Sequence, residues 1–107
     1  MEAWAILLLA IVLEVAGTTC MKLAEGFTRP LPALFMVVFY AGSFAALTIA
    51  VKRIDLGIAY AVWAGLGTAL IAAIGMVYFR EAVTPLRLAS IGLIILGVIG
   101  LNLAPSR

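Results

Sequence analysis

The sequence predicts an all-α integral membrane protein with four transmembrane helices per chain, arranged as a dimeric, antiparallel bundle. Of its 107 residues 66% are apolar, whereas soluble domains are about half apolar. Only seven residues are basic and five acidic. The charges divide the chain into four apolar segments, each close to the roughly 20 residues that cross a hydrocarbon core of about 30 Å.

The first predicted helix covers residues 3–21 and contains one charged residue, Glu14. A polar stretch from Lys22 to Pro30 follows and predicts a turn. A cleaved secretory signal is not expected, because the start of the chain lacks a basic region and carries Glu2. We therefore expect the first apolar segment to belong to the mature protein.

The second and third helices are predicted over residues 32–51 and 57–79. A proline suits the first turn of a helix, where its missing N–H would have no partner, so Pro32 favours a start there. The third segment contains Gly65 and Gly67, which weaken a helix and are more frequent in membrane spans than in soluble helices. We expect a hinge near these two glycines.

The fourth helix is predicted over residues 85–104, and all four belong to one domain, residues 1–107. This last segment has no ionisable residue between Arg87 and Arg107, and small side chains recur along it. Such stripes allow helices to approach closely in lipid, which predicts a subunit interface or a contact within the chain. The stripe consists of Ser90, Gly97, Gly100 and Ala104.

Positive charges show no clear bias between the two sides of the membrane. An excess of Lys and Arg normally marks the cytoplasmic loops. The four-helix topology places three of these residues on one side and four on the other, so either the chain inserts both ways round or the charges near helix ends count for little. The two groups are Lys52, Arg53 and Arg107 against Lys22, Arg29, Arg80 and Arg87.

Glu14 is the strongest candidate for a functional residue. An ionised side chain at the centre of a membrane helix costs roughly 2.5 to 3.5 kcal/mol on insertion scales. Hydrocarbon favours the neutral acid, so Glu14 is a candidate for proton exchange; alternatively it is a protonated packing acid. Small residues at helical spacing surround it, which predicts that this face meets other helices. These neighbours are Ala10, Gly17 and Thr18, with Leu7 and Met21 one turn further.

Aromatic side chains at membrane depth could complete a cation site around Glu14. Tyr40 and Ser43 share one helix face, and Tyr60 and Trp63 share another. An aromatic face attracts a cation by about 0.5 to 2 kcal/mol and suits a bulky organic cation. Tyr60 could instead belong to the interfacial aromatic belt.

Other classes of function find little support. Histidine is absent and Cys20 is the single cysteine, which argues against disulfides, thiolate catalysis and most metal sites. No nucleophile and base can be paired, so an enzyme is not expected, nor is a cofactor. Scattered positive charge argues against nucleic acid as a partner.

A second copy would solve two problems of so small a chain. Four short helices cannot easily enclose an organic cation and also provide an interface, and only one acid lies within the membrane. Two copies in opposite orientations would acquire the inverted symmetry that larger transporters encode as internal repeats.

Essentially the whole chain resembles the small multidrug resistance transporters. The similarity is carried by residues 14–19 (EVAGTT), 21–22 (MK), 25–28 (EGFT) and 57–63 (GIAYAVW). It implies a proton-driven antiporter in the bacterial inner membrane, an antiparallel homodimer whose Glu14 pair binds either protons or substrate. The pocket expected from the residues and the resemblance together comprises Trp4, Leu7, Ala10, Gly17, Thr18, Tyr40, Ser43, Tyr60 and Trp63.

The branch of the family bears on the substrate. Gly17-Thr18-Thr19 looks like the branch that exports quaternary ammonium compounds and causes antiseptic resistance, while guanidinium exporters usually carry a tryptophan close after the glutamate. Trp4 and Ser90 depart from the best-known multidrug pattern, which has Tyr and Gly there. Export of guanidinium or polyamines, a heterodimer with a paralogue, and a non-transporting subunit that needs a partner remain alternatives.

Overall fold

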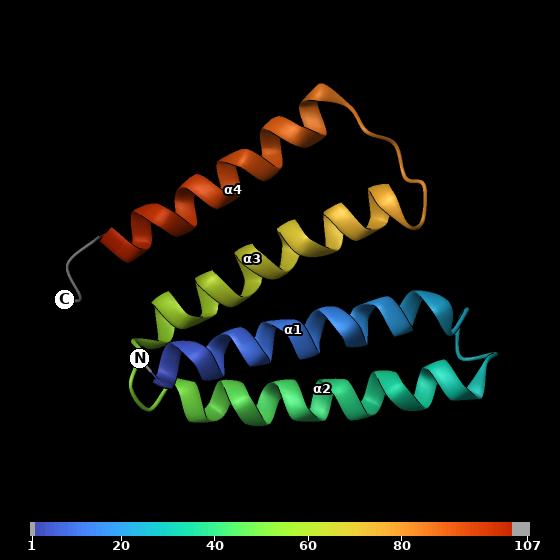
Figure 1. Cartoon of the computed structure of the whole chain (residues 1–107), viewed down its shortest axis with the longest axis horizontal. Helices are drawn as coiled ribbons and strands as arrows, with labels where there is room; N and C mark the ends of the chain where they lie inside the picture. The colour runs from blue at the N-terminus through green and yellow to red at the C-terminus, as the bar shows by residue number, and fades with distance from the viewer. Residues whose placement is uncertain (1, 104–107) are drawn as a thin grey trace.

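The computed structural model of the chain describes residues 2–103, which form four helices. Figure 1 labels them by their order along the chain, and each is long and apolar enough to cross a membrane. The all-α membrane fold is therefore confirmed. The helix bounds differ from the predicted ranges by no more than a residue or two, and the predicted end at Ala104 lies outside the described residues. The helices are α1 (Glu2–Leu23), α2 (Pro30–Ala50), α3 (Leu56–Val77) and α4 (Pro85–Leu103).

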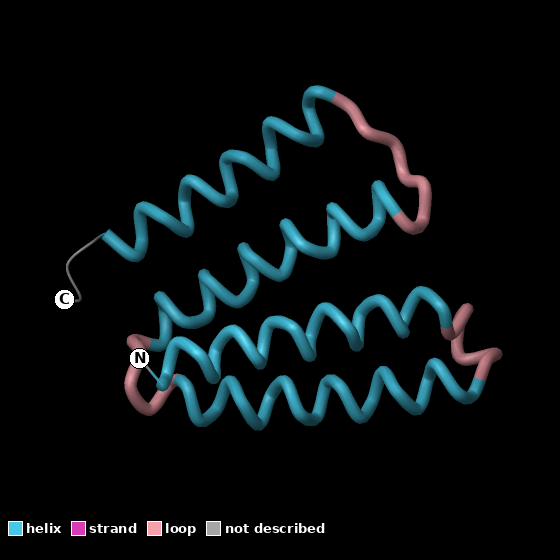
Figure 2. The backbone as a smooth tube through the Cα atoms, in the orientation of Figure 1, coloured by secondary structure: helices cyan, strands magenta, loops and turns pink. Residues whose placement is uncertain are grey.

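The helices lie side by side in the order α2, α1, α3, α4, and successive helices run in opposite directions (Figure 1). The molecule is flat, with principal extents of 45 × 35 × 17 Å. Short loops join the helices at both ends (Figure 2). A flat sheet of helices leaves much apolar surface uncovered, and in a membrane that surface meets lipid or another subunit.

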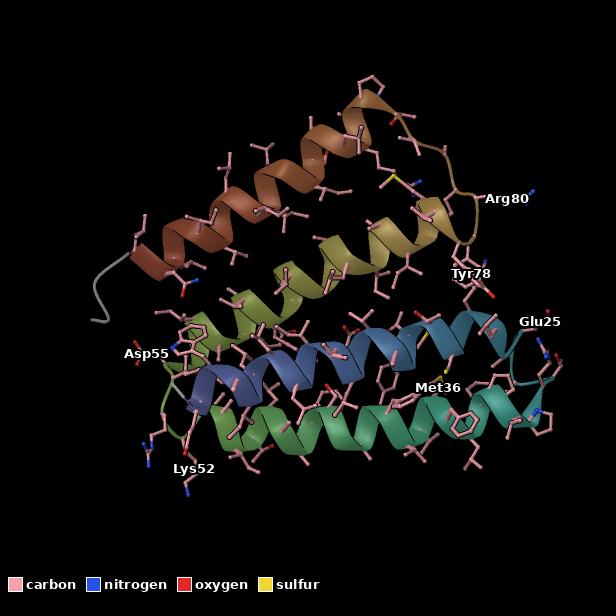
Figure 3. The ribbon with its side chains drawn as sticks, viewed as in Figure 1. Glu25, Met36, Lys52, Asp55, Tyr78 and Arg80 are labelled. Carbon is pink, nitrogen blue, oxygen red and sulfur yellow. The ribbon has the colours of Figure 1, made fainter. Side chains whose placement is uncertain are left out.

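Charged residues border the apolar spans at both ends of the molecule. Figure 3 shows Lys52 and Asp55 at one end and Glu25 and Arg80 at the other. This is the distribution expected when the helix centres lie in hydrocarbon, because charged side chains are least costly near the membrane surface.

The buried apolar core lies where α1 meets α2 and α3. Leu7 and Ile11 of α1 are almost completely buried and belong to one apolar cluster with Ala50, Ala59 and Val62. Small residues on α2 and α3 let the larger α1 side chains reach between the backbones. α1 is therefore the central helix of the chain.

The two glycines in the middle of α3 face different neighbours. A methyl group on Gly65 would meet Val98 and Ile94 of α4, whereas one on Gly67 would meet the carboxyl group of Glu14 on α1. α3 stays helical through both positions. The structure therefore assigns both glycines to close helix contacts, while the expected hinge stays a prediction.

Candidate functional site

Glu14 lies in the middle of α1, half-buried, with its carboxyl group against α3. A methyl group placed on Gly67 would lie only 2.9 Å from Oε1 of Glu14. Glycine is therefore the residue that leaves room for the acid between the two helices. The predicted small face of α1 does meet neighbouring helices, as its pattern indicates.

Two hydroxyl groups extend from the acid toward α2. Thr18 Oγ1 donates to Oε2 of Glu14 over 2.8 Å, and it lies 2.6 Å from the hydroxyl oxygen of Tyr40. Thr18 has one hydroxyl hydrogen, so while it donates to Glu14 it accepts from Tyr40. The three side chains form a chain of hydrogen bonds from α1 to α2.

Gly17 provides the space for this arrangement on the α2 side. A methyl group there would lie 2.8 and 2.9 Å from two carbons of the Tyr40 ring. The ring can therefore lie close against α1, with its hydroxyl group beside Thr18.

Side chains of α2 and α3 form an aromatic cluster. The ring centroid of Trp63 is 5.5 Å from that of Tyr60 and 5.6 Å from that of Phe44. Trp63 Nε1 is buried and has no hydrogen-bond partner among the described residues. Phe44 was not predicted, although its position four residues after Tyr40 places it on the same side of α2.

A cavity of about 1170 Å³ lies between α1 and α3. Glu14, Thr18 and Trp63 line it, and it extends to the end of the molecule that carries the α1–α2 and α3–α4 loops. On α3 the cavity is lined by a row of residues spaced four apart. Of this row, the sequence predicted only Trp63 as a pocket residue. The row consists of Trp63, Gly67, Ile71 and Gly75.

Comparison with known proteins identifies the family. The model of the family described as "Small Multidrug Resistance protein" matches residues 2–94.

The chain belongs to the small multidrug resistance family.

Three relatives show the range of this family. The chain is 51% identical to the uncharacterized membrane protein YvaE of Bacillus subtilis, over 94% of this chain and 84% of the relative. It is 46% identical to the multidrug resistance protein EbrB of Bacillus licheniformis (95% and 86%). It is 42% identical to a guanidinium exporter of Escherichia coli (95% and 97%).

Membership in the small multidrug resistance family, together with the four apolar spans, places the protein in the bacterial inner membrane as a multi-pass protein. The family consists of exporters rather than enzymes. One relative is named a multidrug resistance protein and another a guanidinium exporter, so the family alone does not assign a substrate.

Several predicted pocket residues of this family member do not line the cavity within one chain. Leu7, Ala10 and Ser43 are fully buried, and Ser43 donates a hydrogen bond of 2.7 Å to the carbonyl oxygen of Ala10. The Ser43–Ala10 hydrogen bond links α2 to α1, and Leu7 belongs to the apolar cluster that also includes residues of α3. Trp4 and Tyr60 are exposed on the outer surface.

The small residues of α4 face away from α3. Ser90, Gly97 and Gly100 are exposed, and a methyl group on either glycine would meet nothing within 4 Å. Ser90 donates to the carbonyl oxygen of Leu86 in its own helix. Ala104 lies outside the described residues. The stripe is thus exposed along the described part of α4, and its role as a subunit interface stays a prediction.

Proposed function

We propose that this protein is a proton-coupled antiporter that exports hydrophobic and quaternary ammonium cations across the bacterial inner membrane. The observation that carries the proposal is the position of Glu14, an acid at membrane depth on the wall of a large cavity. A carboxylate in such a place is costly unless a cation or a proton neutralises it.

The shape and chemistry of the cavity favour bulky organic cations. Sites for drug-sized ligands usually enclose about 300 to 1000 Å³, and the volume here is of that order. Most of its lining is apolar, and Trp63 lines it together with Glu14. A delocalised, poorly hydrated cation gains from both the carboxylate and the aromatic face.

Competition between protons and cations at Glu14 provides the coupling. A cation held by the ionised carboxylate leaves when the acid takes up a proton, so one site serves both ions in turn. Thr18 supports the ionised form by donating a hydrogen bond to it. No further cofactor is needed, because the proton gradient drives the exchange.

A second copy, inserted in the opposite orientation, would complete the transporter. The exposed glycines of α4 support an interface there, since small residues allow close helix contact in lipid. The antiparallel pair would place two Glu14 residues in one assembly and give it inverted symmetry. A paralogue could take the place of the second copy.

Guanidinium is the second candidate substrate, favoured by the relative that is named a guanidinium exporter. Guanidinium is small compared with the cavity between α1 and α3, so it would leave most of the volume unfilled. The size of the cavity therefore favours the larger cations.

The test is cation-evoked current in liposomes that contain only this protein. We expect currents with tetraalkylammonium and bulky aromatic cations that disappear in Glu14→Gln. Currents with guanidinium alone would indicate that the protein is a guanidinium exporter. Normal uphill export by Glu14→Gln would overturn the proposed coupling, and silence with every cation would favour a subunit that needs a partner.

A further inference from the structure

A second carboxylate lines the same cavity, at its mouth. Glu81 follows the end of α3 and lies among the lining residues together with Glu14. Its carboxyl group occupies the space where Gly75 would carry a side chain, as the carboxyl group of Glu14 does at Gly67. Glu14 and Glu81 are thus each seated on a glycine of α3.

The backbone at the end of α3 directs Glu81 onto this site. α3 ends at Val77, and Arg80 adopts a left-handed conformation with φ of 58°. The chain then folds back, so that the N–H of Glu81 donates over 2.9 Å to the carbonyl oxygen of Gly75. This hydrogen bond holds Glu81 over the last turn of the helix.

The separation of the two acids follows from helix geometry. Gly67 and Gly75 are eight residues apart on α3, which at a rise of 1.5 Å per residue amounts to about 12 Å. Ile71 lies between them on the same cavity-lining stripe. Of the three acids that line the cavity, Glu14 and Glu81 therefore lie about 12 Å apart along an apolar stripe of α3, and the third is Glu25.

Arg87 is the residue that competes for Glu81. Its Nη2 lies 3.5 Å from Oε1 of Glu81, and both side chains are about two-fifths exposed (39% and 43%). Exposed ion pairs of this kind add little to stability. Arg87 keeps a shorter hydrogen bond of 2.6 Å from Nη1 to the carbonyl oxygen of Ala82. It can release Glu81 to a ligand and still keep a partner.

We propose that the cavity binds elongated dications, with one cationic centre at Glu14, the other at Glu81, and an apolar spacer along α3. This inference rests on the proposed cation export and specifies its substrate class. The second contact is made within an already bound ligand, so its effective concentration is high and its effect on affinity exceeds that of an isolated surface contact.

Spacer length is the first measurement. The probes are polymethylene bis-trimethylammonium ions of increasing length, each compared with the alkyltrimethylammonium of the same chain length. An extended chain advances about 1.2 Å per bond, so a spacer of roughly ten bonds matches the site. We expect the affinity ratio of dication to matched monocation to peak near this length. A flat ratio would overturn the proposal.

Glu81→Gln is the decisive variant. We expect the affinity ratio of dication to monocation at the best spacer length to fall about tenfold, because the variant loses one close charge contact near the protein surface. Two variants serve as controls. Glu25→Gln removes another acid from the mouth of the cavity, and Asp55→Asn removes an acid from the opposite end of α3. We expect neither variant to change the spacer length at which the affinity ratio peaks. An equal effect of Glu25→Gln would indicate general attraction rather than a site.

Two further outcomes separate this inference from the proposed function. If Glu81→Gln keeps the same peak, the second charge is held elsewhere, for example by the second Glu14 of a dimer, and the inference fails while cation export stands. If the wild-type protein moves no monocation at all, the proposed export itself fails. Tryptophan fluorescence of each purified variant checks that the fold is retained.

Discussion

Gly67 on α3 and Glu14 on α1 fit together so closely that one added methyl group would lie 2.9 Å from the carboxyl oxygen Oε1. The acid is thus positioned by a residue that has no side chain. Sequence reasoning identified both residues but treated Gly67 as part of a hinge. The structure shows instead that Gly67 makes room for the carboxyl group of Glu14.

Gly67→Ala is expected to move the carboxyl group without unfolding the protein. The atom in the way is the end of a flexible side chain, and alanine favours a helix by about 1 kcal/mol over glycine. We predict that cation affinity, measured by tryptophan fluorescence, falls about tenfold, which equals about 1.4 kcal/mol.

Gly57→Ala is the matched control for that experiment. Gly57 lies in the first turn of the same helix, and a methyl group there would meet nothing within 4 Å. The cation affinity of the Gly57→Ala variant should equal that of the wild type. Equal losses in both variants would mean that helix flexibility, rather than the position of Glu14, determines affinity.

Thr18→Val should weaken cation binding, because it removes the hydroxyl group that donates to the carboxylate of Glu14. Hydrogen bonds to charged groups contribute about 1.5 to 3 kcal/mol, so we expect a loss of at least about tenfold in affinity. Thr18→Ser keeps the donor and should bind almost normally. Equilibrium binding of a quaternary ammonium ion to the purified protein tests both variants.

Tyr40→Phe should act through Thr18. The tyrosine hydroxyl group lies 2.6 Å from Thr18 Oγ1, so its removal matters only while Thr18 has a hydroxyl group. A double-mutant cycle with Thr18→Val therefore predicts a coupling above about 0.5 kcal/mol. Purely additive losses would show that Tyr40 contacts the ligand independently.

Ser43→Ala should reduce stability rather than affinity. Ser43 is fully buried and donates to the carbonyl oxygen of Ala10, which links α2 to α1. Loss of one such hydrogen bond costs about 1 kcal/mol. Thermal unfolding in detergent measures it. Weaker cation binding at unchanged thermal stability would instead place Ser43 in the binding pocket.

Gly97→Leu tests the proposed subunit interface. A leucine at this position has open space within the chain, so each protomer should fold as before. If α4 forms the interface, the dissociation constant of the dimer should rise at least about tenfold, or about 1.4 kcal/mol. Energy transfer between labelled subunits provides the measurement. Gly92→Leu, which also finds open space but on another side of α4, is the control.

The fold was largely predictable because membrane spans depend on length and polarity, which can be counted along a chain. The site was predictable in part. Glu14, Thr18 and Trp63 were predicted together and do line one cavity. Ser43 was grouped with them because it shares a helix face with Tyr40, but helical spacing does not say which neighbour that face meets.

Glu81 shows most clearly what helical patterns omit. Its contact with Gly75 depends on a chain reversal through the left-handed Arg80, a conformation that no periodicity reveals. The same holds for Gly67, since only the packing of α1 on α3 shows that its missing side chain makes room for an acid.

The sequence by itself determined the four membrane spans, the isolated acid within the first and the small residues around it, because hydrophobic length and the cost of a buried charge are properties of composition and local spacing. The tertiary structure alone decided which groups meet that acid and which form the cavity. Those relations depend on how each helix is rotated against its neighbours, and this is determined by contacts between residues far apart in the chain.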